Sequence, residues 1–164
     1  AVSLEVEPGR YLTAESCSLL TQIRSVKNTG GNRFYLVDAG FDTLIRPAMY
    51  GSYHEISIAA ADGRVIGNAS DAIVAGPLCE SGDVFTQEEG GVVTTRRLPA
   101  AVAGDYLVLH DAGAYGASMS SNYNTRRLAA EVLLGADGGA DIIRERQTFE
   151  HILQFERVPE SLKA

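Results

Sequence analysis

Short runs of apolar or β-branched residues recur along the chain, and Gly, Asp and Asn residues separate these runs from the polar positions between them. This pattern is typical of β-strands joined by turns. The pattern predicts strands at Leu19–Val26, Phe34–Val37, Glu55–Ala59, Ala72–Ala75, Val92–Thr95, Asp105–His110 and Glu131–Leu134. Strands at this spacing favour a barrel or a sandwich, so the predicted fold is mainly β.

Helical periodicity is confined to two places. Apolar residues recur at helical spacing in Thr148–Glu156, where Thr148 is suited to be the N-cap and Pro159 closes the segment. A second short helix is expected through Ala114–Met119. We therefore predict short helices near Tyr115 and near the C-terminus only.

The 164 residues are enough for one domain with its own core. Residues 1–15 carry a turn with chemically distinctive side chains before the strand pattern begins. The sequence therefore predicts a boundary that separates residues 1–15, part of another unit, from a β domain at residues 16–164.

Composition narrows the function. Hydrophobic residues make up 45% and charged residues 21%, which is typical of a globular protein, and the net charge of −7 argues against nucleic-acid binding. No apolar run approaches the ~20 residues of a membrane span. No signal peptide pattern opens the chain, so we expect no membrane partner and a cytoplasmic location.

The reactive side chains are few. Lys27 and Lys163 are the only lysines, and neither lies in a segment that predicts a buried, activated amine. Cys17 and Cys79 are expected to be free thiols. The histidines are widely scattered, so no metal site is predicted.

Two short blocks are candidates for anion binding. Glu7–Arg10 combines a glycine that permits close backbone approach with a forked guanidinium, although an ordinary turn would have the same sequence. Arg46 and Tyr50 lie four residues apart, with a proline directly after the arginine and a glycine directly after the tyrosine, and such a pair suits one carboxylate. A surface turn is the alternative for this second block.

Two further blocks hold polar chemistry in loops. Gly76–Asp83 includes Cys79, suited to proton transfer, and Glu80, suited to bind an ammonium, although a small buried cysteine beside a common turn is the alternative. Asp111–Gly116 places the hydroxyl of Tyr115 on a turn after a strand. The glycine spacing there does not match a dinucleotide or P-loop motif.

Taken in order, the blocks resemble one family. They are Glu7–Arg10, Asp38–Gly40, Arg46–His54, Gly76–Asp83, Asp111–Gly116 and Ser120–Asn124. This order is similar to that of the diaminopimelate decarboxylases, enzymes that depend on pyridoxal phosphate (PLP) and have an alanine racemase/ornithine decarboxylase-like fold. The resemblance covers nearly the whole chain and implies that it is the C-terminal half, with Cys17 standing where a glycine is expected.

The resemblance also implies roles. PLP would be bound near Glu7, Gly9, Arg10 and Tyr115. The small-molecule substrate, meso-diaminopimelate, would be bound by Arg10, Arg46, Tyr50, Glu80 and Tyr115. Cys79 would be catalytic as the proton donor, and the products would be L-lysine and CO₂, as in lysine biosynthesis.

The partners follow from the same resemblance. The N-terminal α/β barrel, whose tail end would be residues 1–15, would supply the Schiff-base lysine, so this chain alone is expected to be inactive. A homodimer would bring Cys79 and Glu80 into the active site of the partner subunit. The alternatives are a decarboxylase of basic amino acids or polyamine precursors, and a non-catalytic β domain used for binding or assembly.

Overall fold

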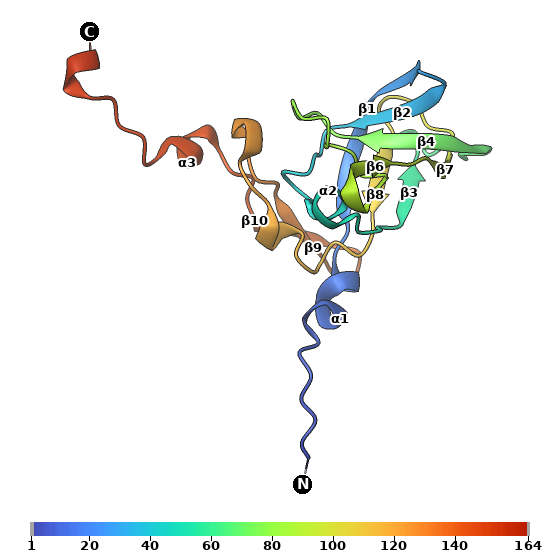
Figure 1. Cartoon of the computed structure of the whole chain (residues 1–164), viewed down its shortest axis with the longest axis horizontal. Helices are drawn as coiled ribbons and strands as arrows, with labels where there is room; N and C mark the ends of the chain where they lie inside the picture. Colours follow the sequence, from blue (N-terminus) through green and yellow to red (C-terminus); the bar gives the residue numbers. More distant parts are fainter. Residues whose placement is uncertain (1, 164) are drawn as a thin grey trace. The chain divides into compact units, whose positions relative to one another are not determined.

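The structure is a computed structural model that describes residues 2–163. Its contacts divide the chain into two units, Ala1–Ser120 and Ser121–Ala164. The helices are α1 (Gly9–Thr13), α2 (Arg46–Tyr50) and α3 (Phe149–Leu153), and the 3-10 segments are η1 (Ala14–Ser16), η2 (Glu89–Gly91), η3 (Ala117–Met119), η4 (Tyr123–Thr125) and η5 (Glu160–Leu162). The strands are β1 (Leu19–Thr29), β2 (Asn32–Val37), β3 (Ile56–Ala59), β4 (Ala69–Ala75), β5 (Gln87–Glu88), β6 (Val92–Val93), β7 (Arg96–Pro99), β8 (Tyr106–Leu109), β9 (Glu131–Leu134) and β10 (Ala140–Arg144) (Figure 1).

The first unit is built on a six-stranded sheet in the order β3-β8-β1-β2-β4-β7. Only the β2–β4 pair is parallel within this sheet, and β1 turns into β2 through Gly30 and Gly31, both at positive φ. The two outermost strands, β3 and β7, also lie against each other. The sheet therefore curves into a nearly closed barrel.

Alternating side chains of the strands fill the inside of this barrel. Ile23, Val37, Val74, Leu107 and Leu109 are almost fully buried. Since successive residues of a strand point to opposite faces, the alternation in the sequence becomes one apolar interior. The core holds the strands in place, and the predicted site residues lie on loops and short helices outside the strands.

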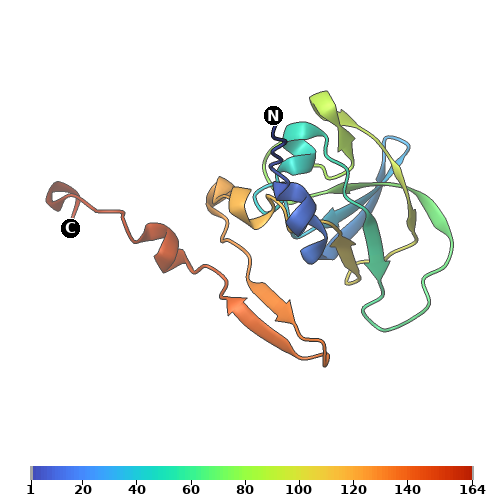
Figure 2. The ribbon, with the colours of Figure 1, turned by 90° about the horizontal axis from the view of Figure 1, so that it is seen from below.

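The second unit contains a two-stranded antiparallel hairpin of β9 and β10, followed by α3 (Figure 2). Thr148 caps α3, because its hydroxyl accepts a hydrogen bond from the backbone N–H of His151 at 3.3 Å. No residue of 121–163 is buried. Apolar side chains such as Leu134, Ile142 and Phe155 are more than half exposed.

The mainly β prediction is confirmed, and so are the N-cap at Thr148 and the strands that correspond to β1, β2, β3, β4, β8 and β9. The predicted strand Val92–Thr95 is correct only for its first half, and the short strands β5, β7 and β10 were not predicted. A helix through Ala114–Met119 was expected, whereas only a 3-10 turn at its end forms.

The N-terminal segment differs from the expectation in a second way. Residues 2–8 form neither helix nor strand, and the block Glu7–Arg10 leads into the short helix α1. The apolar side chains of Val2, Leu4 and Tyr11 are exposed. The boundary between residues 15 and 16 stays a prediction. No helix within residues 2–163 has the length and apolar content needed to cross a bilayer.

Candidate functional site

The loop after β8 packs closely on the segment that follows α1. A side chain on Gly113 would lie 1.9 Å from the carbonyl oxygen of Thr13, so only glycine fits there. The Gly113 N–H also donates to the carbonyl of Ala14 at 3.0 Å. This contact brings two predicted site residues together, because a Cβ on Gly9 would lie 3.0 Å from the hydroxyl of Tyr115.

The loop holds Tyr115 in a conformation that is unfavourable for its own backbone. Tyr115 and Asp111 both have positive φ, at 60° and 57°. Left-handed geometry at residues other than glycine costs about 1–3 kcal/mol and persists only where the surroundings impose it. Here the imposed turn places the ring of Tyr115 5.5 Å from the guanidinium carbon of Arg46.

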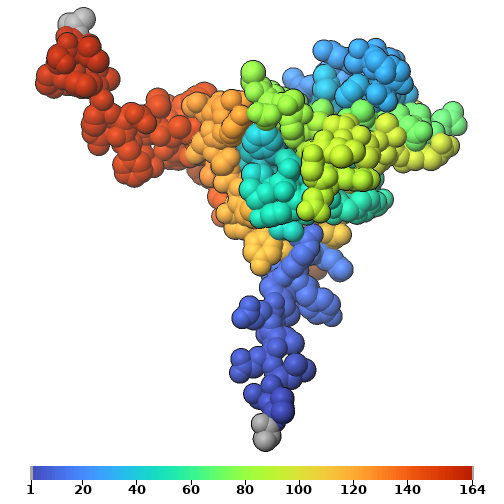
Figure 3. All heavy atoms as spheres, viewed as in Figure 1, coloured from blue at the N-terminus to red at the C-terminus, as the bar shows by residue number. Residues whose placement is uncertain are grey.

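Arg46 and Tyr50 stand on one face of the short helix α2. Pro47 lies in its first turn, and Gly51 ends it in the left-handed conformation, with its N–H bonded to the carbonyl of Pro47 at 3.0 Å. A Cβ on Gly51 would lie 2.0 Å from the backbone nitrogen of Glu89, so α2 is pressed against η2. Figure 3 shows the two segments side by side, α2 in teal and η2 in yellow-green. The Tyr50 ring lies 5.0 Å from the Arg46 guanidinium.

His54 joins Arg10 to this group. Its side chain is 1% exposed, and its Nδ1 lies 2.8 Å from the backbone oxygen of His110. Burial lowers the pKa of His54 most, the charges of Arg10 and Arg46 lower it further, and the His110 carbonyl and Asp111 act in the opposite direction. Both arginines therefore face the same neutral imidazole.

We call Gly9, Arg10, Arg46, Tyr50 and Tyr115 the arginine cluster. Within residues 2–163, four buried side-chain nitrogen atoms lack a hydrogen-bond partner. Three of them belong to this neighbourhood: Nη1 of Arg10, Nε of Arg46 and Nε2 of His54. Leaving such a group without a partner costs about 1–3 kcal/mol. Two cationic donors that lack a partner at one place form an arrangement suited to bind a carboxylate or phosphate.

Asp83 ties the loop of Cys79 to the loop that precedes α2. Its carboxylate is 3% exposed and accepts hydrogen bonds from the backbone N–H groups of Phe41 and Leu78, both at 2.8 Å. A side chain on Gly76 would lie 2.2 Å from the same carboxylate. The position of the Cys79 loop therefore depends on a buried acid within it.

The side chains of three further predicted site residues are exposed, and one of the three, Glu7, contacts the arginine cluster through its backbone. Glu80 accepts hydrogen bonds from the Ser81 hydroxyl and the Gly82 N–H, both at 3.2 Å, so its contacts lie within its own turn. Cys79 is exposed, and neither cysteine forms a disulfide in the described part of the chain. The carbonyl of Glu7 accepts from the Gly9 N–H at 2.9 Å, while its side chain is exposed.

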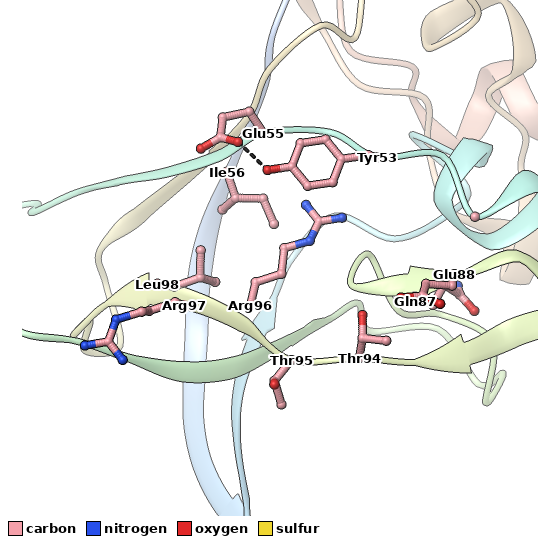
Figure 4. A pocket seen from close by; sticks show the side chains of 11 residues that line it. Tyr53, Glu55, Ile56, Gln87, Glu88, Thr94, Thr95, Arg96, Arg97 and Leu98 are labelled. Carbon is pink, nitrogen blue, oxygen red and sulfur yellow. Dashed lines mark hydrogen bonds between the residues drawn. The ribbon is translucent and has the colours of Figure 1, made fainter.

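A depression of about 450 Å³ lies beside the cluster rather than at it (Figure 4). Arg96 stacks 4.1 Å from the ring of Tyr53 there, and its Nη1 donates to the backbone oxygen of His54. Tyr53 donates a hydrogen bond to Glu55, which raises the pKa of Tyr53. None of the predicted site residues lines this depression.

His54, Asp83 and Arg96 were not singled out from the sequence. His54 and Asp83 lie inside the recognised blocks, but a histidine among strand residues and an acid in a turn have many ordinary roles. Arg96 lies in a strand that was not predicted. No group of three or more His, Cys, Asp or Glu within residues 2–163 is arranged to hold a metal ion.

A nearly closed barrel that carries an arginine cluster on its loops matches a known class of domain. The model of the family described as pyridoxal-dependent decarboxylase, C-terminal sheet domain, matches residues 10–113, so the chain belongs to this family. Individual relatives within the family allow a narrower comparison. The diaminopimelate decarboxylase of Escherichia coli K12 is 64% identical over 157 residues, which are 94% of this chain and 37% of that protein.

Solved structures give the same result. A crystal structure of diaminopimelate decarboxylase superimposes with a TM-score of 0.87 and 63% identity, covering 90% of this chain and 35% of that one. The diaminopimelate decarboxylase of M. jannaschii in complex with L-lysine gives a TM-score of 0.82 at 36% identity, covering 94% and 33%. The chain thus spans little more than a third of the length of these relatives.

Proposed function

We propose that the full protein carrying this chain is a PLP-dependent diaminopimelate decarboxylase, which converts meso-diaminopimelate to L-lysine and CO₂. The observation that carries the proposal is the pair of guanidinium groups, of Arg10 and Arg46, whose buried N–H groups have no partner in residues 2–163. The identity of 64% to a diaminopimelate decarboxylase over nearly all of this chain supports it. Alone, this chain is expected to be inactive.

In this proposal the arginine cluster binds the substrate carboxylate that does not react. The rings of Tyr50 and Tyr115 lie 5.0 and 5.5 Å from the guanidinium carbon of Arg46 and restrict the orientation of this group. Arg10 supplies a second guanidinium. A forked guanidinium binds a carboxylate through two parallel hydrogen bonds. The Tyr50 hydroxyl supplies a third donor. A substrate held in this way presents its other end to the cofactor in a fixed orientation.

The residues around Gly9 fit the edge of a cofactor site. The missing side chain at Gly9 leaves its backbone close to the Tyr115 hydroxyl, so the segment offers a phenol and backbone N–H groups in one place. Glu7, Gly9, Arg10 and Tyr115 would contact PLP, whose ring takes up the electron pair left by the departing CO₂. Lys27 is exposed on β1 and Lys163 pairs with Glu160, so the Schiff-base lysine is expected in the N-terminal barrel.

Cys79 is proposed as the proton donor after CO₂ leaves, and Glu80 as the group that binds the substrate ammonium. Both side chains are exposed on a loop fixed by Asp83, which suits groups that act on a site formed with another subunit. We therefore propose a homodimer in which Cys79 and Glu80 serve the partner subunit. A cytoplasmic location, where thiols stay reduced, is part of the same proposal.

The first experiment uses the full protein and compares decarboxylation of diaminopimelate with that of ornithine and arginine. Cys79→Ala is expected to lower kcat by about 100-fold, in the range of lost general acid catalysis, while the absorbance of bound PLP is retained. Cys17→Ala is the matched control, since Cys17 is the other exposed thiol.

Two results would contradict the proposal. A full protein that binds no PLP would remove the enzyme assignment and favour a binding or assembly domain. Preferential turnover of ornithine or arginine would leave the family intact but replace the substrate.

A further inference from the structure

The imidazole of His54 is fixed from two sides. Its Nδ1 lies 2.8 Å from the backbone oxygen of His110, which can only accept, so Nδ1 carries a proton. Its backbone oxygen accepts a hydrogen bond from Arg96 on β7. The Nδ1 hydrogen bond orients the ring, and the Arg96 hydrogen bond holds the backbone that carries it.

The protonation state of His54 follows from its surroundings. The charged groups that face it are Arg10 from α1, Arg46 from α2, Asp111 from the loop after β8 and Arg96 from β7. Burial and the first two arginines lower the pKa of His54, and together they outweigh Asp111 and the His110 carbonyl. With Nδ1 protonated and the ring neutral, Nε2 is a lone-pair acceptor.

The charges of Arg10 and Arg46 act on this imidazole, and both arginines have buried donors that need an acceptor. Nε2 of His54, Nη1 of Arg10 and Nε of Arg46 are all buried without a partner in the described chain. Of the two arginines, Arg10 acts more strongly on His54. Arg46 is already held by two tyrosine rings and by a hydrogen bond to the Ser52 hydroxyl at 3.4 Å.

We propose that neutral His54 is a positioning residue for substrate binding, whose Nε2 accepts a hydrogen bond from Nη1 of Arg10 when the carboxylate is bound. Because Nη1 of Arg10 is then bonded to His54, the other N–H groups of Arg10 point toward the carboxylate, beside those of Arg46. His54 itself does not touch the substrate. The inference rests on the proposed function, because it explains how one of the two carboxylate-binding arginines is oriented.

Two amide substitutions of His54 test the roles of its two ring nitrogens separately. His54→Asn keeps a donor near the position of Nδ1 for the His110 carbonyl but loses the acceptor that faces Arg10. His54→Gln places its amide near the position of Nε2 and can restore an acceptor there. In the full protein, His54→Asn is expected to raise KM for diaminopimelate about tenfold with a much smaller change in kcat, since a hydrogen bond to a charged group is lost. His54→Gln should recover most of this affinity.

The pH dependence of KM distinguishes this role from a purely structural one, which would leave that dependence unchanged. When pH falls through the lowered pKa of His54, protonation removes the acceptor and adds a third positive charge beside Arg10 and Arg46. KM of the wild type should therefore rise at acid pH, and this rise should be absent in His54→Asn. A KM and an acid limb unchanged by His54→Asn would overturn the inference.

A spectroscopic measurement is independent of turnover. The Nε2 resonance of histidine-labelled full protein should have the chemical shift of a lone-pair nitrogen, and Arg10→Lys should change that shift more than Arg24→Lys. Arg24 is exposed on β1 and serves as the control. Equal shifts in both variants would overturn the inference even if His54→Asn fails to fold. If the wild type does not turn over diaminopimelate, the proposed function has failed, and the nitrogen shifts still decide whether His54 orients Arg10.

Discussion

The two arginines of the cluster show how single residues are prepared for binding. Each has a guanidinium nitrogen that is shielded from water and lacks a partner in residues 2–163. For Arg46, stacking against two tyrosine rings offsets part of this cost. The sequence could predict these arginines because they stand in distinctive blocks. It could not predict the role of His54, which depends on contacts with residues far away in the chain.

A buried acid that is paired with a partly exposed arginine gives a pH prediction at the scale of single residues. Asp105 is 1% exposed and is bonded to Arg64, and this bond lowers the pKa of Asp105. Because its pKa is lower in the folded state, its contribution to stability is complete above the unfolded value of about 3.9 and is lost as pH falls through the folded value. Asp105→Asn should therefore reduce Tm at neutral pH and flatten its decline below about pH 4.

Thermal unfolding of the full protein between pH 7 and pH 3 checks this prediction. Arg64 is partly exposed, so salt should weaken the effect. A decline in Tm with the same slope in Asp105→Asn and in the wild type would show that other carboxylates control the acid transition. Asp71→Asn, at an exposed position, is the control.

The elements of the site are short, and neighbouring backbone holds them in place. The strands that supply the core were predictable, since each contains a short apolar run bounded by turn residues. β7 and β10 were missed because arginine and aspartate interrupt their apolar residues. α2 was missed because five residues are too few to show a helical period. Its position comes from Gly51 and η2, a contact that no local pattern predicts.

Replacing Gly51 or Gly63 by alanine distinguishes two costs at the scale of elements, an unfavourable backbone conformation and a steric clash. Both have positive φ, at 61° and 74°, but a Cβ on Gly51 would collide with the backbone of Glu89, while one on Gly63 meets nothing within 4 Å. Gly63→Ala should cost about 1 kcal/mol from conformation alone. Gly51→Ala should cost clearly more and should raise KM, because α2 and Arg46 must move. Urea unfolding and steady-state kinetics of the full protein check this, and equal costs with unchanged KM would contradict it.

Asp83 allows a second test of how loops are held. Asp83→Asn leaves an amide NH₂ facing one of two backbone N–H groups, so it should lower the free energy of unfolding by about 1–3 kcal/mol. Since the loop of Cys79 would loosen, kcat should fall as well. Urea unfolding and single-turnover kinetics measure both effects, with Asp71→Asn as control. A variant with lower stability but normal kcat would show that the loop does not need Asp83 for catalysis.

At the scale of the whole molecule, the chain spans 37% of the length of its Escherichia coli relative. Residues 121–163 have no buried side chain, and a two-stranded hairpin is at best marginally stable without further packing. The apolar side chains of Val2, Leu4, Tyr11 and Leu12 are exposed, and an exposed apolar segment of this kind is typical of a surface that another part of a protein covers. Since relatives are nearly three times as long as the matched region, the rest of the full protein is the proposed cover.

The most direct test of the central claim is the ratio of kcat/KM for meso-diaminopimelate to kcat/KM for D-lysine, which keeps the D-configured end that reacts and lacks the second carboxylate. It should be measured on the full protein for the wild type, Arg46→Ala and the exposed control Arg24→Ala. The account predicts a large ratio in the wild type and in Arg24→Ala, and a fall of about 100-fold in Arg46→Ala, the size of losing a forked charged contact. A ratio that Arg46→Ala leaves unchanged would show that the arginine cluster does not bind the second carboxylate.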